Sequence, residues 1–223
     1  KSYLSSKLYL LVEKSMRIFS DHYILVSKYD QRIGIKNKII STNNSTLIYN
    51  GSQDLWLNKP IRDKSQKIII SFVARFSYQK DHDTLFKALS LLDQDQLNNI
   101  SINLIGDGDL YDEFVLKSIN MNLISSLNFI GETENVGEYL NNSDVFMLIS
   151  NYEGLPVSII EALSVGLPII ASDVGGINEL VIDRVNGFLV PKNNQEKLAG
   201  VLKDIIKNKS INLENMGEES RLL

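Results

Sequence analysis

Short apolar runs alternate with amphipathic segments over residues 67–207. Several runs, such as Ile68–Ile70, are apolar at every position, which is typical of strands covered on both faces. The predicted strands are Lys67–Val73, Ser101–Ile105, Leu127–Ile130, Val145–Ile149, Pro168–Ala171 and Gly187–Val190. The predicted helices are Thr84–Leu92, Leu110–Ile119, Val136–Leu140, Val157–Val165, Asn178–Ile182 and Gln195–Lys207. This alternation predicts an α/β fold built on a doubly wound parallel sheet.

The first 60 residues follow a different pattern. A helical stripe is formed by Leu4, Leu8, Leu11 and Val12, and short strands are predicted at Tyr23–Val26 and Leu47–Tyr49. The polar stretch Asn58–Lys64 contains a proline and predicts a linker, so we place a boundary between about residues 49 and 66. Residues 1–60 are too few for a domain with its own core and are interpreted as the end of a preceding domain plus a hinge. Residues 61–208 form the main domain, and residues 209–223 a polar tail that is either frayed or a helix cut short.

Composition excludes several classes of site. The chain has 223 residues, a net charge of −4, no cysteine and two histidines. It therefore has no thiolate catalysis, no cysteine-ligated metal and no multi-histidine metal site of its own. The acidic balance argues against a nucleic-acid partner. No apolar run approaches the roughly 18 residues of a membrane span. Lys7, Lys14 and Arg17 on the first helix allow peripheral membrane contact, although a packing helix with a solvated face is the favoured interpretation.

Two cations follow the first strand of the main domain. Arg75 and Lys80 come after Val73 and immediately before a helix. A guanidinium fork beside an ammonium suits a diphosphate, and two solvated surface cations are the alternative. Asp81 and Asp83 are expected to cap the following helix.

A glycine-rich turn follows the second strand. Gly106 and Gly108 begin a G-x-G-x-x-G pattern, but position 111 is Tyr111, so the dinucleotide fingerprint fails. Asp107 and Asp109 have a spacing that can hold a divalent cation. Helix capping by Asp109 and a tight glycine turn explain the segment without a metal.

The segment Glu153–Ala162 is the most informative. Gly154 and Pro156 predict a helix that begins near Leu155–Val157, and the free N–H groups of such a start favour oxygen-rich ligands. If the segment were helical, Glu153 and Glu161 would lie about 12 Å apart, which disfavours a glycosidase pair. Glu161 suits the role of an acceptor for two adjacent hydroxyls, and surface or capping glutamates are the alternative.

A fourth strand end carries Gly175-Gly176 before a predicted helix. Its N–H groups are suited to phosphate or sugar oxygens, and a tight crossover turn is an equally good interpretation.

In this order, these motifs resemble a known family. Arg75 and Lys80, the Ile105–Gly108 turn, Phe129–Gly131, Glu153–Ser172, Gly175–Glu179 and Asn186–Val190 are similar to group 1 retaining glycosyltransferases of the GT-B fold. The resemblance covers about Tyr23 to Val190. It implies two Rossmann-like domains, of which residues 61–208 are the nucleotide-sugar donor domain and residues 1–60 the remnant of the acceptor domain. Most of the acceptor domain lies outside this sequence, so donor binding is expected of this chain and turnover only together with the missing part.

The resemblance also implies roles for individual residues. Arg75, Lys80 and Glu153 are the catalytic candidates, with the two cations on the donor diphosphate and Glu153 beside the transferred sugar. The donor site further includes Gly106, Gly131, Thr133, Gly154, Leu155, Val157 and Glu161, with Glu161 on the ribose hydroxyls and residues 131–133 along the base. No metal cofactor is expected, because the cations stabilise the departing nucleotide.

The expected function is transfer of a hexose from a nucleotide diphosphate sugar to an acceptor hydroxyl, with retention, in surface polysaccharide or glycolipid biosynthesis. The acceptor would be a glycan or lipid-linked glycan, and the expected location is the cytoplasm, including the inner face of the membrane. A noncatalytic nucleotide-sugar binding module and a nucleotide-sugar epimerase of the same fold are the alternatives. The sequence specifies neither the sugar, the base, the acceptor nor the oligomeric state.

Overall fold

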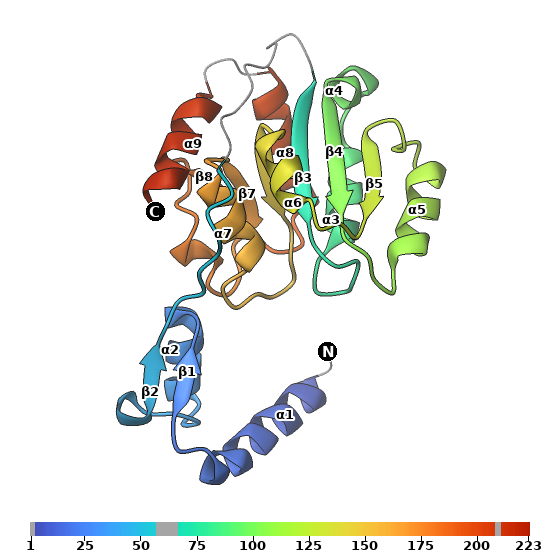
Figure 1. Ribbon diagram of the computed structural model, residues 1–223. Helices are drawn as coiled ribbons and strands as arrows, with labels where there is room; N and C mark the ends of the chain where they lie inside the picture. Colours follow the sequence, from blue (N-terminus) through green and yellow to red (C-terminus); the bar gives the residue numbers. More distant parts are fainter. Residues whose placement is uncertain (1–2, 57–66, 208–210) are drawn as a thin grey trace. The chain divides into compact units, whose positions relative to one another are not determined.

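A computed structural model describes residues 3–56, 67–207 and 211–223 (Figure 1). The chain forms two compact units, residues 1–50 and 51–223, which are described separately. The predicted linker Asn58–Lys64 lies outside the described residues. The assignment of residues 1–60 to the remnant of an acceptor domain stays a prediction.

The larger unit is built on a six-stranded sheet with the order β5-β4-β3-β6-β7-β8, in which every neighbouring pair is parallel. The strands are β3 (Ile68–Val73), β4 (Ile100–Ile105), β5 (Leu127–Gly131), β6 (Val145–Leu148), β7 (Ile169–Ser172) and β8 (Gly187–Val190). All six were predicted within one residue at each end. The chain runs outward from β3 to β5, then returns to β6 and runs outward the other way. The β3/β6 pair is therefore the topological switch point, where ligands bind in sheets of this kind.

Helices cover both faces of the sheet (Figure 1). They are α3 (His82–Leu89), α4 (Gln94–Asn98), α5 (Tyr111–Asn120), α6 (Val136–Asn141), α7 (Val157–Ser164), α8 (Gln195–Lys207) and α9 (Leu213–Leu222). Helix α3 packs against α8, and α7 packs against α9. Because the crossovers are right-handed and the chain reverses direction at the switch point, α3 and α7 lie on opposite faces.

The apolar strands form the core between these layers. Phe72, Phe146, Met147 and Ile170 are fully buried, and burial of each such side chain contributes about 1.5–3 kcal/mol. Every residue of β6 and β7 is buried, as expected for strands without polar alternation. The prediction of a doubly wound parallel sheet is confirmed.

Three segments differ from the prediction. Residues Asn178–Ile182 were expected to be a helix, but only the 3₁₀ turn η3 (Ile177–Glu179) forms. The buried Asn186 side chain accepts from the N–H of Ile182 and donates to the carbonyl of Leu180, so it occupies backbone groups that a longer helix would need. Helix α4 was not predicted; Asp93 begins it with a capping box that includes Gln96. The tail, expected to be frayed or a helix cut short, contains α9.

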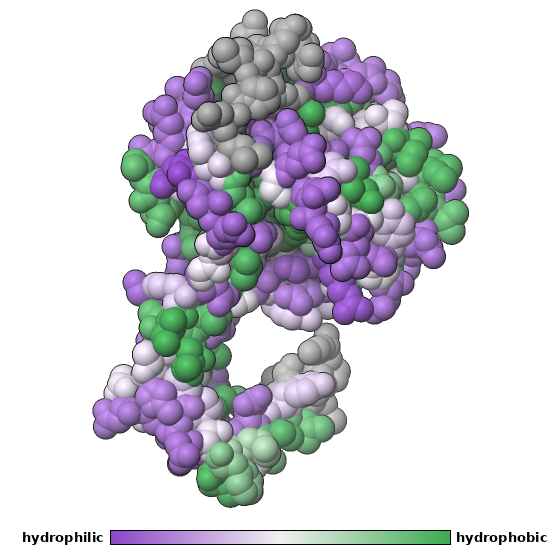
Figure 2. Space-filling view, viewed as in Figure 1, coloured by the Kyte–Doolittle hydropathy of each residue, from purple (hydrophilic) through white to green (hydrophobic). Residues whose placement is uncertain are grey.

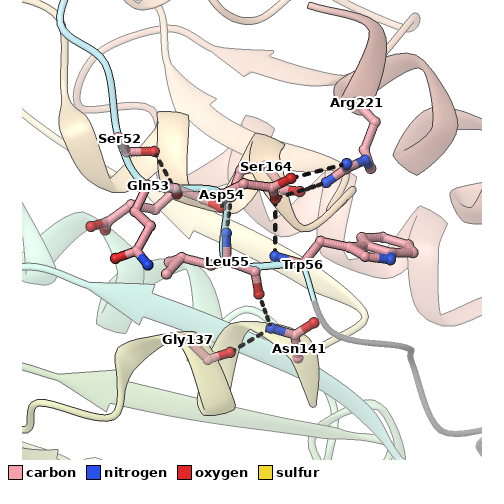
Figure 3. A network of polar contacts seen from close by, with 10 residues as sticks. Ser52, Gln53, Asp54, Leu55, Trp56, Gly137, Asn141, Ser164 and Arg221 are labelled. Carbon is pink, nitrogen blue, oxygen red and sulfur yellow. Dashed lines mark hydrogen bonds and ion pairs between the residues drawn. The ribbon is translucent and has the colours of Figure 1, made fainter.

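Polar contacts hold residues 52–56 against the rest of the larger unit (Figure 3). Arg221 of α9 pairs with Asp54 at 3.2 Å and lies over the ring of Trp56. The carbonyl of Leu55 accepts from Asn141 Nδ2 at 2.8 Å, and the N–H of Leu55 donates to Ser164 Oγ. Helices α6, α7 and α9 therefore each contribute a side chain that contacts residues 52–56.

The smaller unit contains α1 (Tyr3–Met16), the 3₁₀ turn η1 (Arg17–Phe19), β1 (Tyr23–Leu25), α2 (Lys28–Lys36), the 3₁₀ turn η2 (Thr42–Asn44) and β2 (Ser45–Leu47). The two strands form a parallel pair, and β2 begins two residues before the strand predicted there. Helix α2 was not predicted; Ser27 caps it by accepting from the N–H of Asp30. Hydrophobic side chains gather at the surface of α1 and η1 (Figure 2), including Leu8, Leu11, Ile18 and Phe19. Within the described residues, no helix has the length and apolar character needed to cross a membrane.

Candidate functional site

The loop after β3 carries both predicted cations, and the structure places them in different surroundings. Asp81 caps α3 by accepting from the N–H of Thr84, as predicted. Asp83, predicted to share this capping role, pairs with Lys87 and Lys117 instead. The loop between Val73 and Asp81 is therefore fixed at both ends, by the sheet and by the helix cap.

Arg75 lies at the mouth of an open cavity of about 680 Å³. The cavity is lined by Val73, Ala74, Arg75, Ile105, Gly106, Asp107, Gly108, Asp109, Glu132, Thr133 and Val136. The Arg75 side chain is 66% exposed and pairs with Asp109, 84% exposed, at 3.3 Å. Such an exposed ion pair is screened by water and exchanges its partner at little cost.

Gly106 and Gly108 allow the cavity to form. Their φ angles are +136° and +150°, and a Cβ atom at either position would lie 2.3 Å from the carbonyl oxygen of Ala74 or 2.5 Å from that of Phe76. Only glycine therefore lets this turn lie against the loop after β3. The predicted tight turn is confirmed, whereas capping by Asp109 is wrong: the residue before α5 is Leu110, and Asp109 pairs with Arg75 instead.

Thr133 lines the same cavity, and Gly131 is bonded to a lining residue without lining the cavity itself. The carbonyl of Gly131 accepts from the N–H of Gly106 at 2.8 Å, so the ends of β4 and β5 are joined there. Thr133 and Glu132 line the cavity together with Arg75. The structure therefore brings Arg75, Gly106 and Thr133 to one hollow, with Gly131 bonded to its wall.

Lys80 and Glu153 meet at the switch point. Lys80 Nζ lies 2.6 Å from Glu153 Oε1, and the two side chains are 17% and 6% exposed. Ser150 Oγ donates to the same carboxylate at 2.7 Å, and Gln79 Nε2 donates to its other oxygen at 3.3 Å. A nearly buried carboxylate with three donors is held in one position. Lys80 and Glu153 were predicted separately; their direct pairing was not.

Backbone contacts fix the loops around this pair. The N–H of Asn151 donates to the carbonyl of Gln79 at 2.7 Å, and Asn151 Nδ2 donates to the carbonyl of Tyr78. Gly175, with φ +61°, lies so close that a Cβ atom would be 1.8 Å from the carbonyl oxygen of Glu153. The N–H of Gly176 donates to the carbonyl of Gly154. Loops after β3, β6 and β7 therefore form one assembly around Glu153.

Helix α7 begins at Val157, within the predicted window, after Pro156 in the cap position. Leu155 is buried and Val157 exposed. Glu161 lies one turn inside the helix and is partly buried, and this burial raises the pKa of its carboxyl above the usual value. Among the described residues, Glu161 neither lines the cavity of Arg75 nor takes part in the polar contacts around Glu153.

Four residues of this region carry contacts that sequence reasoning did not assign. Ser150 and Gln79 bind Glu153, Asp109 binds Arg75, and His82 lies under the loop that bears both cations. Asp109 belongs to the Asp-x-Asp spacing described above, which predicts a metal ligand or a helix cap and not an ion pair with Arg75; the other three belong to no motif that marks them. Only their place at the strand ends, where residues distant in sequence meet, reveals them.

Comparisons with known proteins agree with this architecture. The family model described as glycosyl transferases group 1 matches residues 55–223. An uncharacterized glycosyltransferase of Haemophilus influenzae is 33% identical over 183 residues, which is 82% of this chain and 51% of that protein. An Escherichia coli protein named UDP-Gal:alpha-D-GlcNAc-diphosphoundecaprenol alpha-1,3-galactosyltransferase is 30% identical over 220 residues, 91% of this chain and 57% of that protein. The chain therefore spans about half the length of these curated relatives.

A solved structure shares the fold. Anabaena HepE in complex with UDP-glucose superposes with a TM-score of 0.83 at 21% identity, over 97% of this chain and 62% of that one. This likeness confirms the expected Rossmann-like half of a GT-B fold. With the family model matching most of the sequence, the chain belongs to the group 1 glycosyl transferases.

Proposed function

We propose that this chain is the donor-binding half of a glycosyltransferase that moves a hexose from a nucleotide diphosphate sugar to an acceptor hydroxyl with retention of configuration. The observation that carries the proposal is the Lys80–Glu153 pair, 2.6 Å apart and nearly buried at the β3/β6 switch point. Neither residue lines the cavity that Arg75 lines; that cavity is formed by residues at or after the ends of β3, β4 and β5. Ligands of doubly wound sheets bind at the switch point.

The charges of the site suit a pyrophosphate. Among the residues that the structure describes, Arg75 pairs with the exposed carboxylate of Asp109, which a phosphate can replace at the planar donor fork. Lys80 donates to Glu153, and an ammonium retains further N–H donors for a phosphate oxygen. These cations would stabilise the charge that develops on the departing nucleotide. We propose on this ground that transfer needs no metal cofactor, so that chelation by EDTA would leave the rate unchanged.

The remaining predicted residues complete the proposed site. Glu153 and the N–H groups of Gly154, Leu155 and Val157 would face the transferred sugar, and Glu161 would accept from the ribose hydroxyls. Gly106, Gly131 and Thr133 would border the nucleoside in the cavity. The raised pKa of Glu161 fits this role, since hydroxyl donors of a bound ribose would replace the water that the carboxylate has lost.

The biological setting is proposed from relatives. The galactosyltransferase of Escherichia coli is named for a diphosphoundecaprenol acceptor, and HepE was crystallised with UDP-glucose. We propose a comparable role in surface polysaccharide or glycolipid assembly, on a glycan or lipid-linked acceptor supplied to an acceptor domain beyond this sequence, in the cytoplasm or at the inner face of the membrane.

Nucleotide binding tests the proposal. Titration calorimetry with UDP, GDP, ADP and dTDP and their glucose or galactose esters should show binding of at least one base. Arg75→Ala should weaken that binding by about 1.5–3 kcal/mol, the contribution of hydrogen bonds to a charged group. Lys87→Ala, a cation on the outer side of α3, is the matched control and should bind normally. Equal affinity of wild type and Arg75→Ala would refute the assigned site.

Retention is tested separately. The full-length protein, supplied with donor and acceptor, should form a product whose anomeric configuration by NMR equals that of the donor. Inversion, or conversion of the donor without an acceptor, would contradict the proposed reaction and indicate an inverting transferase or an epimerase, respectively.

A further inference from the structure

His82 lies directly beneath the loop that carries both cations. It is the first residue of α3 and is 1% exposed. Its ring stacks on Phe76 with centroids 4.2 Å apart and an interplanar angle of 13°, and it also contacts Phe72 and Phe114. The imidazole is therefore part of an aromatic cluster below the site.

One ring nitrogen of His82 is bonded to the loop. Nδ1 lies 2.5 Å from the carbonyl oxygen of Lys80. Because a carbonyl oxygen only accepts, Nδ1 must carry the proton, and Nε2 is left as a bare acceptor. Burial lowers the pKa of His82 to about 4, so the ring is neutral at neutral pH and this tautomer persists.

The other ring nitrogen, Nε2, is buried without a hydrogen-bond partner in the part of the chain that the structure describes. Among the described residues, Nε2 of His82 is the buried side-chain atom that lacks a hydrogen-bond partner. A buried acceptor without a donor destabilises the folded state, and a phenylalanine would fill the same aromatic cluster without it. Packing alone therefore does not explain a histidine here, whereas the bond from Nδ1 to Lys80 does.

That bond acts close to both cations. The carbonyl that accepts it belongs to Lys80 itself, whose Nζ binds Glu153. The ring that donates it stacks on Phe76, the residue next to Arg75. His82 thus bonds the Lys80 carbonyl through its ring Nδ1 as well as through its own backbone N–H at 2.6 Å, and its ring packs on the side chain next to Arg75.

We propose that His82 is a positioning residue for donor binding: its Nδ1–H holds the Lys80 peptide so that Nζ stays at Glu153, where it can receive a diphosphate. The proposal rests on the proposed function of Lys80. His82 touches neither the cavity lining nor Glu153 in the contacts described, so it acts through Lys80.

Two substitutions separate positioning from packing. His82→Phe keeps a ring in the aromatic cluster and removes the donor. His82→Asn removes the ring and keeps an N–H donor on the atom that corresponds to Nδ1. The whole chain is used for each variant, with affinity measured by calorimetry for whichever of UDP, GDP, ADP and dTDP the wild type binds, and the thermal midpoint measured without nucleotide.

If His82 positions Lys80, the two variants should rank in one order by nucleotide affinity and in the opposite order by thermal midpoint. His82→Phe should bind the nucleotide roughly tenfold more weakly, about 1.4 kcal/mol, with a thermal midpoint equal to or above that of wild type. His82→Asn should bind within about threefold of wild type although it melts at a lower temperature. Wild-type affinity in His82→Phe, or affinities that follow the thermal midpoints, would overturn the proposal. The His82→Phe result decides alone if His82→Asn does not fold.

A measurement without nucleotide distinguishes failure of this proposal from failure of the proposed function. The ¹⁵N resonance of the Lys80 ammonium, assigned with Lys80→Ala, should be protected from water exchange in wild type and His82→Asn and lost in His82→Phe. If no nucleotide binds the wild type but this pattern is found, the positioning role stands and the proposed function fails. An unchanged resonance in His82→Phe overturns the positioning role.

Discussion

Arg75 and Lys80 follow the same strand five residues apart, yet the fold treats them differently. Lys80 is 17% exposed and lies 2.6 Å from a carboxylate that is 6% exposed, with Ser150 and Gln79 on the same carboxylate. Arg75 is 66% exposed and its partner Asp109 is 84% exposed, at 3.3 Å. The charge of Lys80 is therefore fixed beside one carboxylate, whereas Arg75 can exchange Asp109 for another anion.

This difference in burial predicts different roles for Lys80 and Arg75. A nearly buried pair whose carboxylate accepts from three donors holds its geometry before any ligand arrives. Removing either charge would leave the other desolvated. An exposed pair contributes little to stability and is readily replaced by a stronger anion. In the proposed donor site, Lys80 would therefore belong to the part that is fixed before the ligand binds, and Arg75 to the part that rearranges when it binds.

Removal of Lys80 is the largest test of this contrast. Lys80→Ala should lower the free energy of unfolding by about 3–5 kcal/mol, because it leaves the Glu153 carboxylate buried without its cation. Arg75→Ala should change it by about 0–1 kcal/mol. Urea denaturation measures both. The double variant Lys80→Ala/Glu153→Gln should recover part of the loss; equal stability of the two alanine variants would remove the contrast.

The pH dependence of the free energy of unfolding tests the burial of His82 next to Lys80. Burial lowers the pKa of His82 from 6.5 to about 4, so the unfolded chain takes up a proton that the folded chain refuses as pH falls from 6.5 to 4. Stability from this group is complete above pH 6.5 and falls by about 3 kcal/mol on reaching pH 4.

Other groups also titrate between pH 6.5 and pH 4, so the test compares the pH dependence of wild type with that of His82→Phe. The raised pKa of Glu161 acts in the opposite direction, because the folded chain binds that proton more readily. Urea denaturation from pH 7 to pH 4 should show a loss in wild type that exceeds the loss in His82→Phe. Parallel profiles for the two proteins would contradict the assignment.

Gly175 tests how tightly the loops enclose Glu153. Gly175→Ala should cost at least about 1–3 kcal/mol for the positive φ alone, with an added clash of Cβ against the Glu153 carbonyl. Gly200→Ala is the matched control, since no atom lies within 4 Å of its added Cβ, and alanine in helix α8 should stabilise by about 0.5–1 kcal/mol. Thermal midpoints that move in the same direction would contradict this close packing.

The smallest effect is expected at Asp109. Asp109→Ala frees Arg75 from its exposed partner and should tighten binding of the nucleotide diphosphate about two- to fivefold, the equivalent of about 0.4–1 kcal/mol. Stability should stay within about 0.5 kcal/mol of wild type. Calorimetry and urea denaturation measure these quantities, and weaker binding would show that Asp109 supports the ligand instead of competing with it.

Much of the larger unit could be predicted from sequence because its strands are apolar at almost every position. β6 and β8 were predicted within one residue at each end, and α8 exactly from the spacing of Leu198, Val201, Leu202 and Ile205. Helices α2 and α4 were missed because neither has an apolar stripe of helical length. Their starts depend on the caps Ser27 and Asp93, which are single polar residues of common types.

The candidate site also contains features that the sequence predicted and features that it did not. Local patterning identified Arg75, Lys80, Glu153 and the glycine turns as candidates, since each follows an apolar strand and the carboxyl ends of parallel strands share one edge of a sheet. The Lys80–Glu153 and Arg75–Asp109 pairs became visible only in the three-dimensional fold, and so did the packing of the His82 ring against Phe114. Pairings between residues about 30 to 70 positions apart depend on strand order and loop packing, and local patterning of the chain encodes neither.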